Sequence, residues 1–344
     1  MPQETRLPLP LGPLEAWLAE AVPGFAGPVE AHQFSGGQSN PTYRLQGPGA
    51  SYVLRRKPPG PLLPKAHMIE REHRVMDALG RAAFPVPRML AYCADDTVIG
   101  SAFFVMEHVE GRVLYDARLP GLTVGERRQT CLALLDTLAR LHRIDPAAVG
   151  LGDFGRPGGY LSRQVAIWTA QYDASATHAI PEMARLADWL PEAVTGIPDE
   201  TCLVHGDYRL DNLILDATTT EIRAVLDWEL STLGHPLADL GYLLMTWVFP
   251  SDLRWGLAEA DLDALGIPRL EALAERYAAA TGRAEIVHLD TLLAYNVWRL
   301  AAILQGVYAR GLAGNAADEA ATTMGADVPR LAAIAWDLAR RAGA

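Results

Sequence analysis

Lysine is almost absent from this chain of 344 residues: only Lys57 and Lys65 occur, so arginine carries nearly all of the positive charge. With 30 basic and 41 acidic side chains, the formal net charge is −11, and no basic stretch is present. Proteins that hold nucleic-acid backbones generally do so with clustered lysine and arginine. The composition therefore argues against a general nucleic-acid binder.

Cysteine and long apolar runs are also scarce. Cys93, Cys131 and Cys202 are scattered and form no CxxC pair, which argues against a disulfide framework or a cysteine zinc site. The first residues lack the basic start and apolar run of a secretory signal. The longest apolar stretch, 242–249, is far shorter than the about 20 residues that cross a bilayer. We expect a cytoplasmic protein without a membrane segment.

Apolar material is plentiful enough for a large core, because half of the residues are hydrophobic and 21% are charged. Up to about residue 110, the chain reads as strand-rich after an initial helix, and the rest reads as mostly helical. Residues 52–56 predict a strand, 68–79 an amphipathic helix, and 102–109 a strand covered on both faces. Such a chain predicts one large domain or two lobes.

Helix signals dominate the second part of the sequence. Thr123 and Glu126 form a capping-box pattern ahead of an apolar stripe that ends before Pro146. Further helices are predicted over 160–190, 255–281, 286–310 and 327–341, with Gly311 as the stop of the third.

The most informative segment runs from His205-Gly-Asp to Asn212, through two strand-like runs to Asp227. If these runs form a hairpin centred between residues 219 and 220, Asn212 faces Asp227, since paired residues lie about 5 Å apart. Amide and carboxylate oxygens are hard ligands that suit Mg²⁺. Asp207 lies on the loop that enters this site and could accept a proton from a substrate hydroxyl.

This spacing resembles the catalytic loop and metal-binding aspartate of protein kinases, with Gly206 in place of arginine and Trp228-Glu229 in place of Phe-Gly. The HGDxxxxN and DWE forms are more similar to the aminoglycoside phosphotransferase family of small-molecule kinases. Five runs within about residues 30–310 resemble the kinase-like proteins associated with acyl-CoA dehydrogenases: GGQSNPTYRL, YVLRRKPPG, IEREHRVMDAL, LSRQVAIWTAQY and DWELSTLGHPLADLGYLL.

The resemblance implies an α+β, two-lobed protein-kinase-like fold. Residues 1–107 would form a strand-rich, nucleotide-binding N-terminal lobe, and 108–344 a mostly helical catalytic and substrate lobe, with ATP bound between them. By the same resemblance, Asp207 is the catalytic base, and Asn212 and Asp227 are the Mg²⁺ ligands. Arg209 would neutralise charge beside the transferring phosphate.

The remaining nucleotide contacts are expected upstream. A loop over the phosphates would be built from Gly36, Gly37, Ser39 and Asn40, where small residues let backbone N–H groups approach oxygen.

Aligning YVLR with the kinase strand pattern puts Arg55 at the phosphate-binding lysine position, with Lys57 on the same strand face as the alternative. Glu72 matches the helix glutamate that pairs with this cation, and Glu70 is its alternative. Arginine is a planar, permanently charged fork rather than a point charge, so its phosphate geometry would differ.

The apolar strand ending near residue 109 resembles the connector of the two lobes. Backbone groups of Glu107 and Val109 would there hydrogen-bond adenine. These main-chain contacts leave the choice between ATP and GTP open.

The expected substrate is a small molecule with a hydroxyl group. Resemblance implies a hydroxyacyl-CoA or hydroxy acid; aminoglycosides are the rival, and a catalytically silent module that binds nucleotide or a partner is the alternative from another class. A hydrolase metal cluster would use the four side chains His205, Asp207, Asp227 and His235. The oligomeric state is open.

Some polar and aromatic residues have structural interpretations. His142 is expected as a buried core histidine and His205 as a structural residue that positions the loop. Asp239 is expected to brace the catalytic loop, and Trp168 with Tyr172 to pack.

Overall fold

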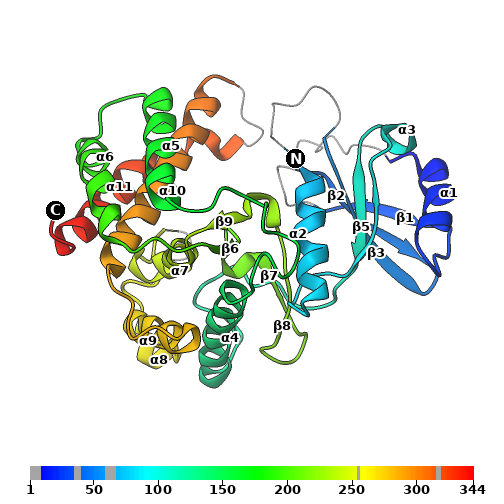
Figure 1. The fold of residues 1–344 in the computed structure, drawn as a ribbon, viewed down its shortest axis with the longest axis horizontal. Helices are drawn as coiled ribbons and strands as arrows, with labels where there is room; N and C mark the ends of the chain where they lie inside the picture. The colour runs from blue at the N-terminus through cyan, green and yellow to red at the C-terminus, as the bar shows by residue number, and fades with distance from the viewer. Residues whose placement is uncertain (1–8, 35–39, 59–66, 254–255, 315–318) are drawn as a thin grey trace. The chain divides into compact units, whose positions relative to one another are not determined.

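The computed structural model describes residues 9–34, 40–58, 67–253, 256–314 and 319–344. Its chain divides into two compact units (Figure 1). Unit 1 consists of residues 1–112, 214–217 and 223–231, and unit 2 of 113–213, 218–222 and 232–344. In the described part of the chain, no helix combines the length and apolar character needed to cross a membrane.

Unit 1 is built on a five-stranded antiparallel sheet with strand order β1-β2-β3-β5-β4. Its elements are α1 (Leu11–Ala21), β1 (Glu30–Gln33), β2 (Thr42–Gly47), β3 (Ala50–Arg56), α2 (Ile69–Arg81), β4 (Met89–Cys93), α3 (Asp96–Ile99) and β5 (Phe103–Glu107). The predicted strands at 52–56 and 102–109 and the helix at 68–79 are therefore present.

Successive side chains of β3 point to opposite faces of the sheet, one covered by α1 and the other by α2. Tyr52 and Leu54 join the apolar core that Leu14 and Leu18 of α1 complete. Arg55 points to the opposite face, where it meets α2. Figure 1 shows α1 and α2 on opposite sides of the sheet. The strand thus buries Tyr52 and Leu54 under α1 and presents Arg55 to α2.

Gly111 is required where the chain leaves β5. A Cβ atom there would lie 2.1 Å from the carbonyl oxygen of Leu215, and Arg112 and Leu215 exchange backbone hydrogen bonds of 2.8 and 2.9 Å. Only glycine allows this approach. The contact ties the segment after β5 to strand β7 within unit 1.

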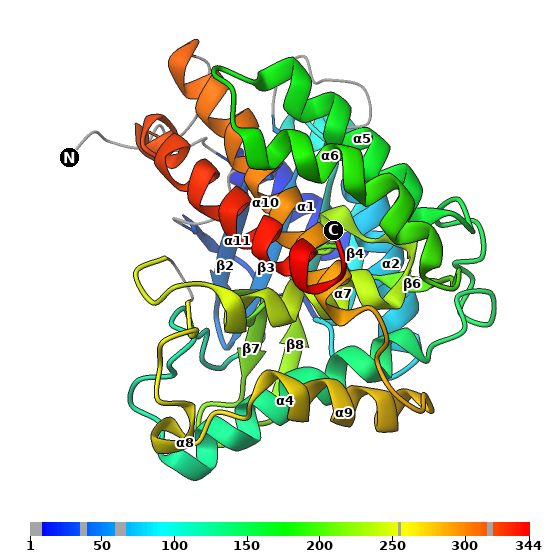
Figure 2. The same cartoon turned by 90° about the vertical axis from the view of Figure 1, so that its left-hand side faces the viewer.

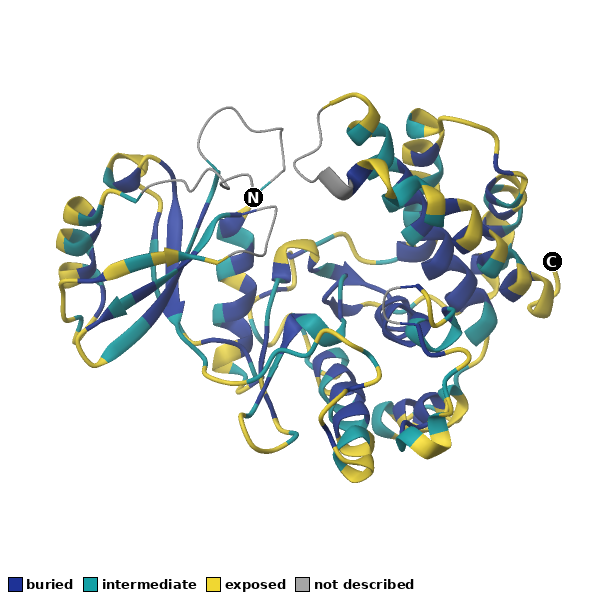
Figure 3. Cartoon of the chain, turned by 180° about the vertical axis from the view of Figure 1, so that it is seen from behind, coloured by how far each residue is buried: buried dark blue, intermediate teal, exposed yellow. Residues whose placement is uncertain are grey.

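Unit 2 is mostly helical, with short strand pairs. Its elements, together with the hairpin β7–β8 that passes in and out of unit 1, are α4 (Val124–His142), α5 (Tyr160–Ser175), α6 (Pro181–Ala193), β6 (Cys202–Val204), β7 (Leu213–Leu215), β8 (Ile222–Val225), β9 (Thr232–Gly234), α7 (Pro236–Leu244), α8 (Leu262–Leu265), α9 (Leu270–Thr281), α10 (Leu289–Leu312) and α11 (Asp327–Arg341). Short 3₁₀ turns connect several of them. Helix α10 is the centre of the unit: it packs against α5, α7 and α11, and its first half is almost entirely buried (Figures 2 and 3).

The predictions of two long unbroken helices are wrong, because the structure interrupts both. The helix predicted over 160–190 is two helices, α5 and α6, because Pro181 removes a backbone donor and disfavours the helical conformation of Ile180. Likewise 255–281 is interrupted between α8 and α9, where Gly266 adopts a positive φ of 74° and Pro268 follows.

Three other predictions about unit 2 concern where its helices begin and end. The capping box of Thr123 and Glu126 is present at the start of α4. Helix α10 continues one residue beyond Gly311, whereas α11 has the bounds predicted for it.

Candidate active site

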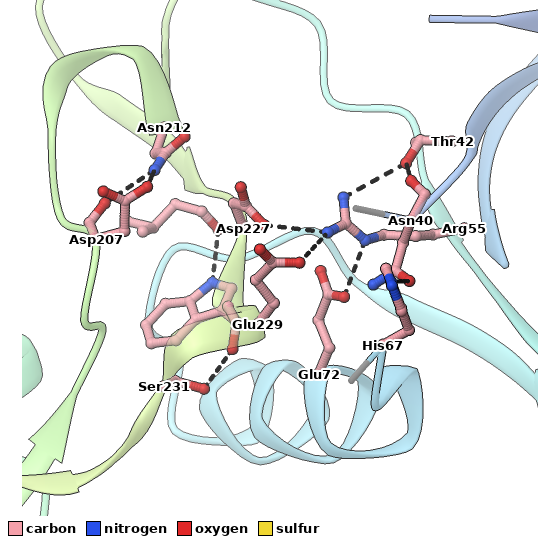
Figure 4. Close-up of polar contacts among 12 residues, drawn as sticks. Asn40, Thr42, Arg55, His67, Glu72, Asp207, Asn212, Asp227, Glu229 and Ser231 are labelled. Atoms are coloured by element: carbon pink, nitrogen blue, oxygen red, sulfur yellow. Dashed lines mark hydrogen bonds and ion pairs between the residues drawn. The ribbon is translucent and has the colours of Figure 1, made fainter. Parts of the chain in front are cut away.

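In unit 1, the guanidinium group of Arg55 contacts three carboxylates (Figure 4). Arg55 Nε donates to Glu72 at 2.9 Å, and its Nη2 lies 3.1 Å from Asp227 and 3.5 Å from Glu229. The Arg55 side chain is 11% exposed and that of Glu72 is 3% exposed. The predicted partners Arg55 and Glu72 are thus brought together, and Glu229 is a partner that the sequence analysis did not anticipate.

The alternative pair forms as well, beside the first. Lys57, the residue that follows β3, has its Nζ 3.0 Å from Glu70 of α2. Both side chains are much more exposed than Arg55 and Glu72, at 29% and 40%. The end of β3 and the residue after it therefore offer a buried cation, Arg55, and a more exposed one, Lys57, each with its own glutamate.

Asp227 is held in a conformation that is rare for a residue with a side chain. Its φ of 62° and ψ of 61° lie in the left-handed region. The next residue anchors this turn: the Trp228 indole donates to the Val225 carbonyl oxygen at 2.9 Å, and the buried ring packs edge-on against Phe84. Strained backbone of this kind is concentrated at functional sites.

The carboxyl group of Glu72 is strongly perturbed. Burial, against the opposing charge of Arg55 and with a contribution from Asp227 and Glu229, raises the pKa of Glu72 to about 7. The Arg55 guanidinium loses solvation on burial, but its three carboxylates together raise its pKa. The cluster therefore holds more negative charge than its single cation balances.

This perturbation predicts a pH-dependent stability. The folded pKa of Glu72 lies above its ordinary value of 4.5, so the folded state binds more protons from about pH 4.5 to 7. The stability contributed by this group is fully present below pH 4.5 and is lost as the pH rises through about 7. Urea unfolding of wild type and Glu72→Gln between pH 5 and 8 should show a steeper decline for wild type. Glu70→Gln, at the half-exposed neighbour, should follow wild type; parallel curves for all three would contradict the assignment.

In unit 2, the predicted catalytic loop is stabilised by hydrogen bonds around Asp207. Asn212 Nδ2 donates to the Asp207 backbone oxygen at 2.9 Å and to its carboxylate at 3.0 Å (Figure 4). Arg209 lies 3.6 Å from the same carboxylate and 3.0 Å from Asp211. Because the amide nitrogen of Asn212 is turned towards Asp207, its oxygen is the atom left to bind a cation.

Asp239 braces this loop as predicted. The amides of His205 and Gly206 donate to its carboxylate at 2.6 and 2.9 Å, and the His142 ring lies 3.4 Å from it. Burial acts to raise the pKa of Asp239, but the hydrogen bonds from His142 and Gly206 and the neighbouring histidines lower it overall. His142 is buried and also contacts the Tyr277 hydroxyl at 2.6 Å, in agreement with its expected core position.

The other expected nucleotide contacts lie in unit 1. Gly36, Gly37 and Ser39 fall outside the described residues. Asn40 is buried, and its side-chain oxygen is 3.0 Å from a ring nitrogen of His67. The Glu107 amide donates to the Arg88 carbonyl oxygen at 3.0 Å, and Glu107 pairs with Tyr52 at the end of β5. The carbonyl of Glu107 and the amide of Val109 are the groups expected to bind adenine. These roles stay predictions.

The hydrolase alternative has no support from the side chains. Among the described residues there is no group of three or more histidine, cysteine, aspartate or glutamate side chains that could hold a metal. One ring nitrogen of His235 accepts from Leu237 N at the start of α7, and the other lies 3.0 Å from the Pro198 carbonyl oxygen. His235 therefore shapes the chain rather than offering a metal ligand.

A profile of the phosphotransferase enzyme family matches residues 30–285, about three quarters of the chain. The chain belongs to this family. Among its relatives, this phosphotransferase is 45% identical to acyl-CoA dehydrogenase family member 11 of Gallus gallus and 44% identical to family member 10 of Mus musculus. The two alignments cover 96% and 92% of this chain but 43% and 30% of the relatives, so the chain spans less than half of their length.

Solved structures agree with this assignment. A Ralstonia eutropha protein, described as a candidate aminoglycoside phosphotransferase, is 44% identical with a TM-score of 0.88, over 97% of this chain and 99% of that one. Aminoglycoside phosphotransferase APH(4)-Ia, solved with AMP-PNP and hygromycin B, has a TM-score of 0.63 at 16% identity, over 97% and 99%. The latter likeness shows the fold alone. The predicted α+β kinase-like fold and family resemblance are confirmed.

Proposed function

We propose that this phosphotransferase transfers a phosphoryl group from ATP to the hydroxyl of a small acyl compound, either a hydroxyacyl-CoA or a hydroxy acid. The observation that carries the proposal is the bonded arrangement of Asp207, Arg209 and Asn212 on one loop. An oriented carboxylate beside a cation is what an acceptor hydroxyl needs, since phosphoryl transfer depends mainly on positioning and charge neutralisation.

In the proposed reaction, Asp207 accepts a hydrogen bond from the acceptor hydroxyl and takes its proton as the oxygen attacks phosphorus. Arg209 balances charge on the transferred group. Arg55 binds the phosphates of the nucleotide from unit 1, oriented by Glu72. The donor set of Asn212 and Asp227 consists of hard oxygens, which fits Mg²⁺. When bound, the ion would neutralise charge on the phosphates.

The acyl acceptor is proposed from the relatives. The curated relatives with 40% identity or more are named acyl-CoA dehydrogenase family members and are more than twice as long as the matched region. These relatives combine a region similar to this phosphotransferase with a name that refers to acyl-CoA. We therefore infer an acceptor that carries an acyl group. The aminoglycoside alternative rests on the 44% identical Ralstonia eutropha protein, described as a candidate aminoglycoside phosphotransferase, and on fold neighbours of about 16% identity or less.

The decisive experiment follows nucleotide binding and turnover in the same samples. Isothermal titration of ATP with and without Mg²⁺ should show metal-dependent binding in wild type and its loss in Asp227→Ala, followed by ADP release that hydroxyacyl-CoA stimulates. Glu221→Ala, an exposed change between β7 and β8, serves as the control and should behave as wild type. Nucleotide binding without release for any hydroxylated acceptor would favour the silent module, release with aminoglycosides alone would favour the rival substrate, and no nucleotide binding would refute the proposal.

A further inference from the structure

Unit 2 contains a small cavity of about 40 Å³ that borders the catalytic loop. Arg209, Leu210 and Asp211 of this loop line part of it, and Tyr242 of α7 lines another part. All of its described lining residues belong to unit 2. Most of the remaining lining is apolar and includes Cys131, Leu134, Met245, Trp247 and Leu257.

The cavity has a buried interior and a more exposed rim. Cys131 of α4 and Leu257 are buried, at 5% and 1% exposure. Arg209, Leu210 and Trp247 are partly exposed. Because two of these three residues belong to the catalytic loop, the cavity opens beside that loop and has its closed end in the core of the unit.

Two lining side chains also contact the proposed base. Arg209 Nε lies 3.6 Å from the Asp207 carboxylate, and the Tyr242 hydroxyl is hydrogen-bonded to the same carboxylate. The Tyr242 ring is held in place by Arg299, whose guanidinium stacks on it at 5.5 Å and donates to the Gly206 carbonyl oxygen at 3.1 Å. Arg209 and Tyr242 thus each contact both the cavity and Asp207.

The lining favours an uncharged, apolar occupant. Among the described lining residues, the only charged ones are Arg209 and Asp211, and they pair with each other at 3.0 Å. An ammonium group that entered the cavity would lose its hydration without gaining a carboxylate of its own, which is costly. The lining therefore disfavours a polycation.

The volume limits the size of the occupant. Since one water molecule requires about 10–15 Å³ of cavity volume, about 40 Å³ gives room for about three groups of that size. A methyl or methylene group is similar in size to a water molecule, so a chain of about three carbons would fill the cavity. A longer chain would have to leave it.

We propose that this cavity holds a short aliphatic group of the acceptor, attached to the carbon that carries the reacting hydroxyl. The hydroxyl then lies next to Asp207, and the aliphatic group lies among Cys131, Leu134 and Leu257. The rest of the acceptor extends past the rim at Arg209. The inference rests on the proposed function, because it names the part of the acceptor that this site selects.

The test measures binding without catalysis. Trifluorobutanol has a hydroxyl and a short apolar chain, and its fluorine NMR signal reports binding to the full chain. Ethanol, propanol, butanol and hexanol are then used as competitors. Their affinity should rise about fourfold with each added carbon as far as butanol, because each carbon is removed from water. Hexanol should bind no more tightly than butanol, since its chain exceeds the cavity.

Two variants change the cavity in opposite directions. Cys131→Leu fills it and should weaken butanol binding at least tenfold. Leu257→Ala enlarges it by three carbons and should strengthen hexanol binding at least fourfold, a gain that general damage to the fold would not produce. Gln129→Leu adds a leucine at an exposed position of α4 outside the lining and should leave all affinities within twofold. Urea unfolding checks that each variant is folded.

The outcomes separate this inference from the proposed reaction. It would be overturned by the absence of trifluorobutanol binding, by hexanol binding more tightly than butanol in wild type, or by unchanged butanol affinity in Cys131→Leu. Any of these results would count against the cavity even if hydroxyacyl-CoA is phosphorylated. The expected chain-length limit and its shifts in the variants would support the cavity even if no acceptor stimulates ADP release and the proposed reaction fails.

Discussion

Asp207→Asn is expected to lower kcat by about 10²–10⁴-fold, the usual contribution of a general base. The substituted amide keeps an oxygen that can accept from Asn212, so the loop should retain its conformation. KM for ATP and the free energy of unfolding should stay near those of wild type. Steady-state ADP release and urea unfolding measure the three quantities.

The matched control for this variant is Asp188→Asn, the same chemical change at an exposed position of α6. It should leave kcat unchanged. Full activity of Asp207→Asn would remove the residue from its role, and a large fall in stability would show that it acts by holding the loop.

Arg55→Ala is expected to have the largest effect on stability. It would leave a fully buried glutamate and two further carboxylates without their shared cation, and breaking such a buried pair costs about 3–5 kcal/mol. Lys57→Ala breaks the neighbouring, more exposed pair and should cost about 1 kcal/mol or less. Because Glu72 can bind a proton below its raised pKa of about 7, the loss in Arg55→Ala should be greater at pH 8 than at pH 6.

Substitutions of Arg55 and Lys57 also decide which of these two cations binds phosphate. If Arg55 does so, Arg55→Lys should weaken ATP binding more than Lys57→Ala, because a lysine cannot reproduce the fork. Titration of ATP in the presence of Mg²⁺ checks this. The reverse order of affinities would assign the phosphate contact to Lys57.

Much of this arrangement could be predicted from local patterns. Alternation along β3 explains why Arg55 faces away from the core that Tyr52 and Leu54 join, whereas its pairing with Glu72 is an expectation of the resemblance to kinases. The hairpin that β7 and β8 form was predicted from two strand-like runs and a polar turn. The bracing role of Asp239 and the core position of His142 came from the same kind of reasoning.

Other features depend on contacts between distant parts of the chain, which no local pattern reports. Glu229 was noted as a departure from the kinase sequence, but its approach to Arg55 requires the left-handed turn at Asp227. Trp168 was expected only to pack; its contact with Arg299 joins positions 131 residues apart. The break before Pro181, by contrast, had a sequence signal, since the residue ahead of a proline rarely stays helical.

Because the two units are interleaved along the chain, no single continuous fragment contains all of unit 1 without part of unit 2. Unit 1 is not a continuous cassette: residues 214–217 and 223–231 return to it after the chain has entered unit 2. A fragment cut after Arg112 would keep Arg55 and Glu72 yet lack Asp227 and Glu229, two of the three carboxylates of its central cluster. Exchange of lobes between relatives by simple end-to-end shuffling would therefore separate Arg55 from these two partners.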